Sequence, residues 1–146
     1  MASRVAWARV LVDNQITGEI GPGLLLLVGV GRDDGAAEAA WLAEKVATLR
    51  VFDDDAGVPN RSLAEVGGGA LVVSQFTLYG DARRGRRPSY VAAARPEAAA
   101  PLVEAVADAL AATGLTVARG RFGAYMRVEA AGDGPVTILL DSARTF

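Results

Sequence analysis

Residues 69–78, Gly-Ala-Leu-Val-Val-Ser-Gln-Phe-Thr-Leu, join a short apolar run to a polar ending. The run Ala70–Val73 is continuous and rich in branched side chains, which is typical of a strand buried on both faces. A second run of this kind, Leu24–Val30, predicts a buried central strand. Ser74–Leu78 then sets two hydroxyl groups and an amide where the first of these strands ends.

Hydrophobic periodicity predicts the remaining elements. Apolar residues at helical spacing indicate helices over Ala36–Leu49 and Glu97–Ala112, and Ser89 is a plausible cap for a third helix that begins near Tyr90. Further strands are predicted at Arg4–Val12, Ile16–Ile20, Leu115–Ala118, Ala124–Ala130 and Val136–Leu140. About seven strands with two or three helices, in a chain of 146 residues, predict one mixed α/β domain over residues 1–146.

Composition excludes several classes of function. The chain has no cysteine and no histidine, so disulfides and thiolate metal sites are excluded. Asp53–Asp55 suggests calcium, but a calcium loop needs a third oxygen ligand where Gly57 stands, so an exposed acidic turn is favoured and no metal is expected. No apolar run reaches the length of a membrane span. The net charge of −2 limits nucleic-acid binding to a local patch.

Three groups of residues are candidates for chemistry. The hydroxyls of Ser74 and Thr77 are weak nucleophiles that need a nearby base, and no imidazole exists to serve, so they could equally satisfy backbone groups where a strand meets a loop. Gly134-Pro135 is either a simple turn or a cis peptide that presents its carbonyls in a fixed direction. An arginine cluster is either a solvated loop or a phosphate-binding loop; it consists of Arg83, Arg84, Arg86 and Arg87.

Together these stretches resemble the D-aminoacyl-tRNA deacylase family. Its two signatures are present as Ser74-Gln75-Phe76-Thr77-Leu78 and Asp133-Gly134-Pro135-Val136-Thr137. Supporting stretches occur in the same order, at residues 18–25, 85–90 and 120–123. The resemblance extends from about Arg4 to Leu140. It implies a mainly antiparallel, sandwich-like or barrel-like sheet with two to three helices, in a homodimer.

The resemblance also implies an activity, which is hydrolysis of the ester bond of D-aminoacyl-tRNA. In the family, the Gly-Pro unit adopts the cis form and enters the partner's pocket, where its carbonyls exclude an L side chain. A D side chain points outward, and glycyl-tRNA, including glycine mischarged on tRNA(Ala), should also be hydrolysed. Gly134 and Pro135 match this gate, and Arg4 matches an arginine that supports it.

The substrate-binding wall implied by the family matches Ser74, Gln75, Phe76, Thr77 and Leu78. Backbone amides around Phe76 and Thr77 would polarise the ester carbonyl, and the 2′-hydroxyl of the terminal adenosine would assist water. An alternative makes Thr77 a nucleophile. The arginine cluster becomes a candidate tRNA contact. The resemblance implies no cofactor, no membrane association and a cytoplasmic location.

Two departures from the family pattern stand near the gate. Gly132 replaces an asparagine that often lies two positions before the Gly-Pro unit, and Ser3 replaces a glutamine before Arg4. Two alternative functions remain open. One is a related deacylase that edits L-alanyl-tRNA with a trans-proline gate, and the other is a dimer that binds tRNA without catalysis.

Overall fold

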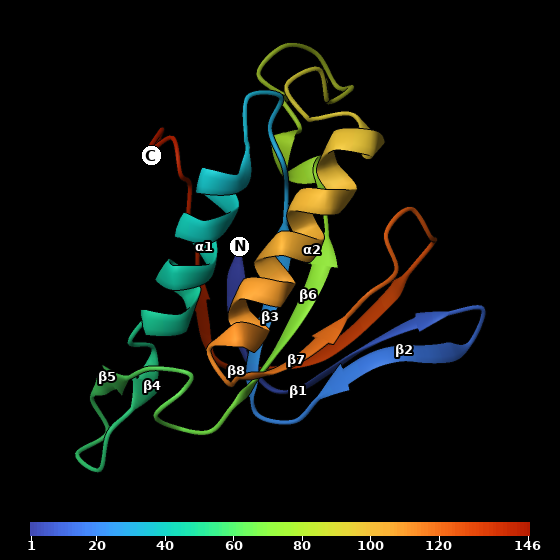
Figure 1. Ribbon diagram of the computed structural model, residues 1–146. Helices are drawn as coiled ribbons and strands as arrows, with labels where there is room; N and C mark the ends of the chain where they lie inside the picture. The colour runs from blue at the N-terminus through green and yellow to red at the C-terminus, as the bar shows by residue number, and fades with distance from the viewer.

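The computed structural model describes residues 1–146 as a curved sheet with two α-helices on one face (Figure 1). The strands are β1 (Ala2–Val12), β2 (Gln15–Ile20), β3 (Gly23–Val28), β6 (Gly69–Ser74), β7 (Thr116–Arg119) and β8 (Arg127–Ile138). A two-stranded ribbon, β4 (Phe52–Asp53) and β5 (Pro59–Arg61), lies apart from this sheet. The helices are α1 (Ala36–Thr48) and α2 (Pro96–Ala112), and a short 3₁₀ turn, η1, spans Phe76–Tyr79.

The sheet has the order β2-β1-β3-β6-β7. β2 and β3 pair with different halves of one side of β1, and β8 pairs along its other side. β1 pairs antiparallel with β2, β3 and β8, whereas β3–β6 and β6–β7 are parallel. The two apolar runs of the sequence are therefore adjacent parallel strands at the centre. The predicted mixed α/β class with a mainly antiparallel, barrel-like core is confirmed.

Alternation along β3 and β6 divides the core into two layers. Leu24, Leu26 and Val72 face the helices, where they pack with Val46 of α1 and Leu110 of α2. The residues between them point to the other side of the sheet and fill the interior of the curved sheet; they include Leu25, Leu71 and Val73. Because strands buried on both faces have no polar side, the sequence of each reads as a continuous apolar run.

Close backbone approach at two glycines lets the sheet curl. A Cβ atom on Gly23 would lie 1.9 Å from the carbonyl oxygen of Gly69 on β6. A Cβ atom on Gly18 of β2 would lie 2.4 Å from the carbonyl oxygen of Arg119 on β7. The Gly18 contact brings the edge strands β2 and β7 together and nearly closes the barrel.

Two local predictions are wrong. No helix starts at Tyr90, because Ser89 instead pairs with Asp81 through reciprocal backbone hydrogen bonds of 2.8 and 2.9 Å. The last two predicted strands are one strand, β8, that pairs with β1 on both sides of an interruption at residues 133–136. Helix α1 is capped by Gly35, whose N–H donates to the carboxylate of Glu38. Neither helix is long and apolar enough to cross a membrane.

Replacing Gly23 tests the close approach of β3 to β6. We expect Gly23→Ala to lower the free energy of unfolding by more than about 3 kcal/mol, because the methyl group would force the central strands apart. Urea denaturation followed by circular dichroism measures this. Gly21→Ala is the matched control, since no atom lies within 4 Å of its Cβ position. Equal denaturation midpoints for the two variants would contradict this account of the packing.

Candidate functional site

The stretch Ser74–Leu78 leaves the sheet at the carboxyl end of β6 and turns at once into η1. The N–H of Gln75 donates to the carbonyl of Val28 at 2.7 Å, which completes the pairing with β3. Within the turn, the N–H of Leu78 donates to the carbonyl of Gln75 at 3.3 Å. The amides of Phe76 and Thr77 precede this bond, at the end of the turn where N–H groups have no acceptor within the helix. They are the amides that the sequence analysis expects to contact substrate.

The first three side chains of η1, those of Phe76, Thr77 and Leu78, are exposed at the surface. Phe76 is 56% exposed and Leu78 is 44% exposed, which is unusual for large apolar side chains in a turn between core elements. The side-chain amide of Gln75 donates a hydrogen bond to the hydroxyl of Thr77. An amide is not a base, so this contact does not activate Thr77 as a nucleophile.

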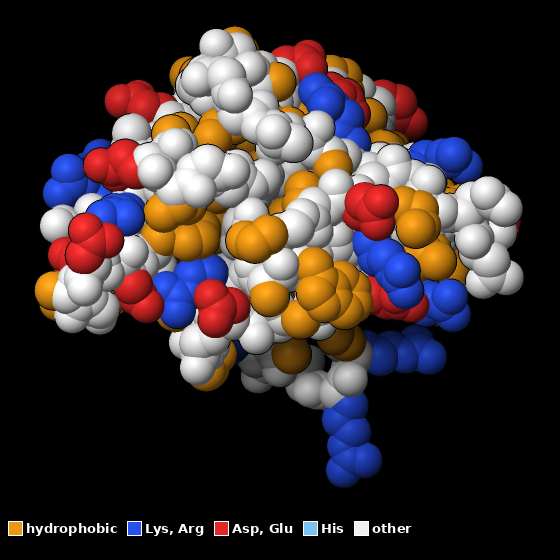
Figure 2. Space-filling view, turned by 90° about the horizontal axis from the view of Figure 1, so that it is seen from below, with side chains coloured by type: hydrophobic (Ala, Val, Ile, Leu, Met, Phe, Trp, Pro, Cys, Tyr) orange, Lys and Arg blue, Asp and Glu red, His pale blue; other side chains and the backbone are white.

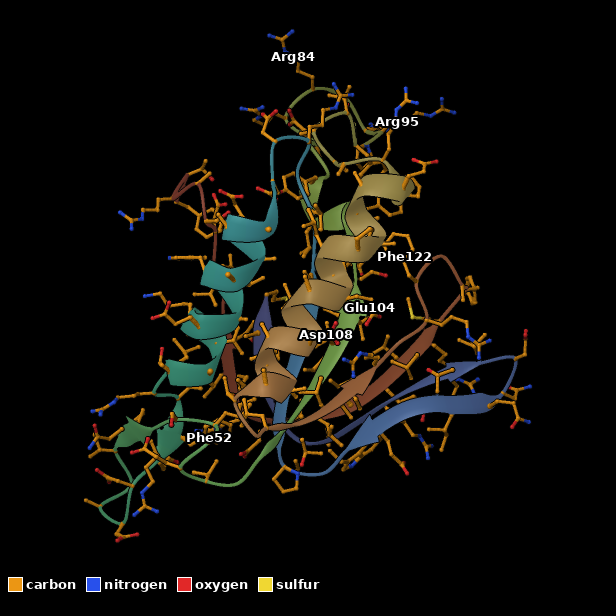
Figure 3. All side chains as sticks on the ribbon, viewed as in Figure 1. Phe52, Arg84, Arg95, Glu104, Asp108 and Phe122 are labelled. Atoms are coloured by element: carbon orange, nitrogen blue, oxygen red, sulfur yellow. The ribbon has the colours of Figure 1, made fainter.

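The arginine cluster lies beside this turn, in the loop that the Asp81–Ser89 pairing closes at its base. The ring of Phe76 meets the ring of Tyr90 edge-on, with centroids 5.1 Å apart. Figure 3 shows Arg84 extended away from the molecule and Arg95 at the start of α2, both at the end of the sheet where β3 and β6 finish. The loop and the turn therefore form one continuous surface.

The four arginines of the cluster are not equivalent. Arg83 binds Asp81 through two side-chain contacts of 2.9 and 2.6 Å. These hydrogen bonds lower the pKa of Asp81 to about 2, so the pair stays ionised at neutral pH. The guanidinium of Arg83 is thus already occupied by a carboxylate. The other three arginines, Arg84, Arg86 and Arg87, have exposed side chains. None of them has a hydrogen-bond or ion-pair partner within the chain.

A third segment reaches the same end of the sheet. The N–H of Gly120, just after β7, donates to the carbonyl of Val72 at 2.9 Å. Phe122 follows in the loop before β8 and is 38% exposed, on the α2 side of that loop (Figure 3). Because β3, β6 and β7 are parallel, their carboxyl ends meet at one edge, which is where ligands bind in many parallel sheets.

The Gly134-Pro135 unit lies in an outward excursion of β8. Val5 pairs with Gly132 and Ser3 pairs with Thr137, so Arg4 alone stands opposite the four residues 133–136. The Gly134-Pro135 peptide bond is cis, and the φ angle of Gly134 is +132°. A Cβ atom on Gly134 would lie 2.8 Å from both the backbone nitrogen and Cγ2 of Val136. Only glycine fits this backbone without displacing its neighbours.

Arg4 holds the start of this excursion. Its Nε donates to the carbonyl of Asp133 at 3.1 Å, and its Nη1 donates to the carbonyl of Val51 at 2.7 Å. The Nε also lies 3.3 Å from the carboxylate of Asp133, and Nη1 lies 3.4 Å from that of Asp53. The side chain of Arg4 is 11% exposed. The guanidinium therefore ties the residue before the Gly-Pro unit to the segment that follows α1.

One chain does not bring the two signature stretches together. Val5 pairs with both Gly132 and Gly23, and Gly23 pairs with Gly69, so the excursion lies level with the start of β6. Ser74 is at the opposite end of that strand. Strand dimensions place the Gly-Pro unit on the order of 20 Å from the Ser74–Leu78 turn. The lower end of the molecule, seen in Figure 2, intersperses acidic, basic and apolar side chains and has no broad basic surface.

The acidic turn at Asp53–Asp55 is closed by hydrogen bonds to one of its own carboxylates. The carboxylate of Asp54 accepts hydrogen bonds from the N–H groups of Ala56 and Val58 at 2.9 and 3.0 Å, which closes the turn between β4 and β5. These bonds lower the pKa of Asp54. No group of three or more histidine, cysteine, aspartate or glutamate side chains is placed to hold a metal ion.

Sequence reasoning missed the residues that support the two stretches. It did not identify Tyr79, which ends the 3₁₀ turn, nor Asp34, whose carboxylate contacts its hydroxyl group at 3.2 Å. It also missed Val51 and Asp53 as partners of Arg4. The only signal was the Gly29-Val30-Gly31 stretch after a buried strand, since glycines there permit close packing of another segment.

Comparisons with known proteins agree with this arrangement. Residues 1–141 match the family described as D-Tyr-tRNA(Tyr) deacylase. A D-aminoacyl-tRNA deacylase of Roseiflexus castenholzii is 62% identical over 96% of this chain and 89% of its own length. A D-aminoacyl-tRNA deacylase of Symbiobacterium thermophilum is 56% identical over 100% of this chain and 97% of its own length.

Two solved structures share the fold. A protein described as a c-Myc DNA unwinding element binding protein superposes with a TM-score of 0.90, at 34% identity over 97% of this chain and 96% of its own. A probable eukaryotic D-amino acid tRNA deacylase gives a TM-score of 0.80 at 16% identity, over 92% and 93% of the two chains. Since the family match covers nearly the whole chain and includes both signature stretches, this chain belongs to the D-Tyr-tRNA(Tyr) deacylase family.

Proposed function

We propose that this protein hydrolyses the ester bond of D-aminoacyl-tRNA and releases the free D-amino acid and the tRNA. The observation that carries the proposal is that a whole-chain member of the deacylase family retains both signature stretches. Ser74–Leu78 forms an exposed turn in which two backbone N–H groups have no acceptor within the helix. The Gly-Pro stretch forms an excursion of β8 that requires glycine and is held by Arg4. The reaction consumes a substrate of protein synthesis, which agrees with a cytoplasmic location.

The chemistry proposed for the turn is polarisation of the ester carbonyl by backbone. The N–H groups of Phe76 and Thr77 would donate to the carbonyl oxygen, and their interaction would strengthen as charge develops on that oxygen in the transition state. Gln75 and the hydroxyl groups of Ser74 and Thr77 would contact the aminoacyl end. Water would attack with help from the terminal 2′-hydroxyl group of the tRNA, since no base contacts Thr77.

The proposed active unit is a homodimer. The two signature stretches are on the order of 20 Å apart in one chain by strand dimensions, so one chain alone cannot contact a single aminoacyl group with both. A twofold axis would let the excursion of each protomer approach the turn of its partner, as isologous contacts are reciprocal. The exposed side chains of Phe76 and Leu78 beside the turn agree with an apolar contact there.

Chirality would then be checked by steric exclusion. The backbone of Gly134 and Pro135 would occupy the space into which an L side chain must point, whereas a D side chain or the hydrogen atom of glycine would meet no obstacle. Discrimination by collision does not depend on what the D side chain is. The same site would accept several D-aminoacyl esters and glycyl-tRNA.

The direct test is hydrolysis of matched D-tyrosyl-tRNA and L-tyrosyl-tRNA by the purified protein. We expect the D ester to be lost at least about a hundredfold faster than the L ester, since a site can reject a misfitting group by that factor. Rapid hydrolysis of L-alanyl-tRNA instead would indicate the related L-alanyl editing reaction. Binding of tRNA without loss of either ester would indicate a non-catalytic tRNA-binding dimer.

Gly134→Ala tests the backbone gate. The methyl group would meet Val136 at 2.8 Å and require an unfavourable φ angle, so the excursion must shift. We expect hydrolysis of D-tyrosyl-tRNA to fall on the order of a hundredfold, the cost of misplacing a reacting group by about 1 Å. Gly132→Ala is the matched control because its Cβ position has no atom within 4 Å. Equal rates in both variants, with unchanged thermal stability, would remove the gate from the mechanism.

The arginine cluster is proposed to contact the phosphates of the tRNA acceptor stem. Arg84, Arg86 and Arg87 are free for this role, while Arg83 is held by Asp81. We expect the triple alanine variant to weaken tRNA binding and to lower the salt-dependence slope by about 0.7–0.9 per lost contact. Arg83→Ala is expected to change the slope less, because Asp81 already binds the Arg83 guanidinium. An unchanged slope in the triple variant, measured by filter binding at several salt concentrations, would discard the assignment.

A further inference from the structure

The 3₁₀ turn of the proposed site rests on the loop between β3 and α1, residues 29–35. A Cβ atom on Gly29 would lie 3.1 Å from the carbonyl oxygen of Gln75 and 3.2 Å from both Leu78 and Tyr79. A Cβ atom on Gly31 would lie 2.7 Å from the hydroxyl oxygen of Tyr79. The turn therefore packs directly against the backbone of this loop at Gly29 and Gly31, where any side chain would displace the turn.

Tyr79 is the only side chain of η1 that enters the body of the protein. Phe76, Thr77 and Leu78 are all exposed, whereas Tyr79 is half-buried against the loop. Its hydroxyl group donates to Oδ2 of Asp34 at 3.2 Å, and the same oxygen accepts the N–H of Gly31 at 2.7 Å. One carboxylate oxygen thus joins the end of the turn to the loop beneath it.

The protonation state of Tyr79 allows its hydroxyl group to donate this hydrogen bond. Burial, followed by the negative charges of Asp34 and Asp141, raises the pKa of Tyr79 to about 12. The phenol therefore remains protonated, and a hydrogen-bond donor, throughout the neutral range. A phenol that donates to a carboxylate forms a charge-assisted hydrogen bond, which is stronger than one between two neutral groups.

The turn has little else to fix its orientation. Short 3₁₀ segments have poor hydrogen-bond geometry and low intrinsic stability. Besides the Leu78 bond, the turn has one backbone bond at each end, from the N–H of Gln75 to the carbonyl of Val28 at 2.7 Å and from the N–H of Gly80 to the carbonyl of Thr77 at 2.9 Å. Only the Gln75 bond reaches the sheet, and it precedes the amides of Phe76 and Thr77.

We propose that Tyr79 and Asp34 are positioning residues that set the direction of the Phe76 and Thr77 amides, with Gly29 and Gly31 providing the backbone surface on which the turn rests. This inference depends on the proposed function, because it assigns the turn to the reacting ester. It adds two side chains, distant from the substrate, that act only through the placement of backbone. Their loss should therefore affect the chemical step more than substrate binding.

The loop also holds the far end of the arginine segment. The N–H of Arg32 donates to the carbonyl of Ala92 at 3.1 Å, and the N–H of Ala94 donates to the carbonyl of Val30 at 2.9 Å. The loop at residues 29–35 is thus the common support of the turn and of the chain that returns from the arginine cluster. The two parts of the proposed site keep a fixed relation through it.

The test compares Tyr79→Phe with the wild-type protein in steady-state hydrolysis of D-tyrosyl-tRNA. We expect kcat to fall about tenfold, the value of one hydrogen bond to a charged group, while KM stays within about twofold because the tRNA contacts remain. Asp34→Asn should give a fall in the same direction. Gly35→Ala is the control in the same loop, as its Cβ position meets nothing nearer than 3.6 Å. An unchanged kcat in Tyr79→Phe would overturn the inference.

A rescue experiment separates positioning from general damage. Gly31→Ala should lower kcat because its methyl group collides with the Tyr79 hydroxyl oxygen. Adding Tyr79→Phe to Gly31→Ala removes the colliding atom, so the double variant should be no slower than Gly31→Ala alone. Such non-additivity is expected of residues in direct contact. Losses that simply multiply in the double variant would contradict the proposed contact.

Hydrogen exchange gives a measurement that does not depend on the reaction. In Tyr79→Phe, the amides of Leu78 and Gly80 should exchange about tenfold faster, as expected for loss of one stabilising bond, while amides in α1 should not change. Faster exchange in a protein whose wild-type form hydrolyses neither ester would uphold the positioning role and reject the proposed function. Unchanged exchange in a protein with full wild-type activity would reject the positioning role alone.

Discussion

The parallel pairing of β3 with β6 is the constraint on which the rest of the structure depends. It begins where a glycine on each strand allows the two backbones to approach more closely than any side chain would permit. From there the two apolar runs travel side by side, one face packed on the helices and the other filling the curved sheet. Because both runs end together, the turn after β6 and the loop after β3 leave the sheet as neighbours.

Much of the fold could be predicted from the sequence, because burial on two faces leaves a plain apolar run. Leu24–Val30 is such a case. The two long helices are predicted from apolar residues at helical spacing, and the positions of all three elements agree with the structure. The false helix at Tyr90 shows the limit of local signals: Ser89 can cap a helix, but in the folded chain its backbone pairs with Asp81. Local propensity is a weak guide where tertiary hydrogen bonds compete.

The candidate site was predictable only in part, for a related reason. Ser74–Leu78, the Gly-Pro unit and Arg4 stand out through recognisable stretches. Tyr79 and Asp34 do not, since their roles arise from a contact between segments 45 residues apart in the chain. Likewise, nothing in the order of residues tells that Asp81 already occupies Arg83. The sequence reveals which charged residues are present, whereas the ion pairs between them appear only in the folded structure.

The excursion of β8 has a consequence for the thermodynamics of association. It is anchored on β1 at both ends, and Arg4 donates a hydrogen bond to the carbonyl of Asp133 at its start. A flexible side chain loses rotamer freedom when it is immobilised in an interface, at a cost of about 0.5–1.5 kcal/mol each. Main chain that is anchored in this way has already lost its conformational freedom during folding, so holding it in a contact would carry a smaller entropy cost.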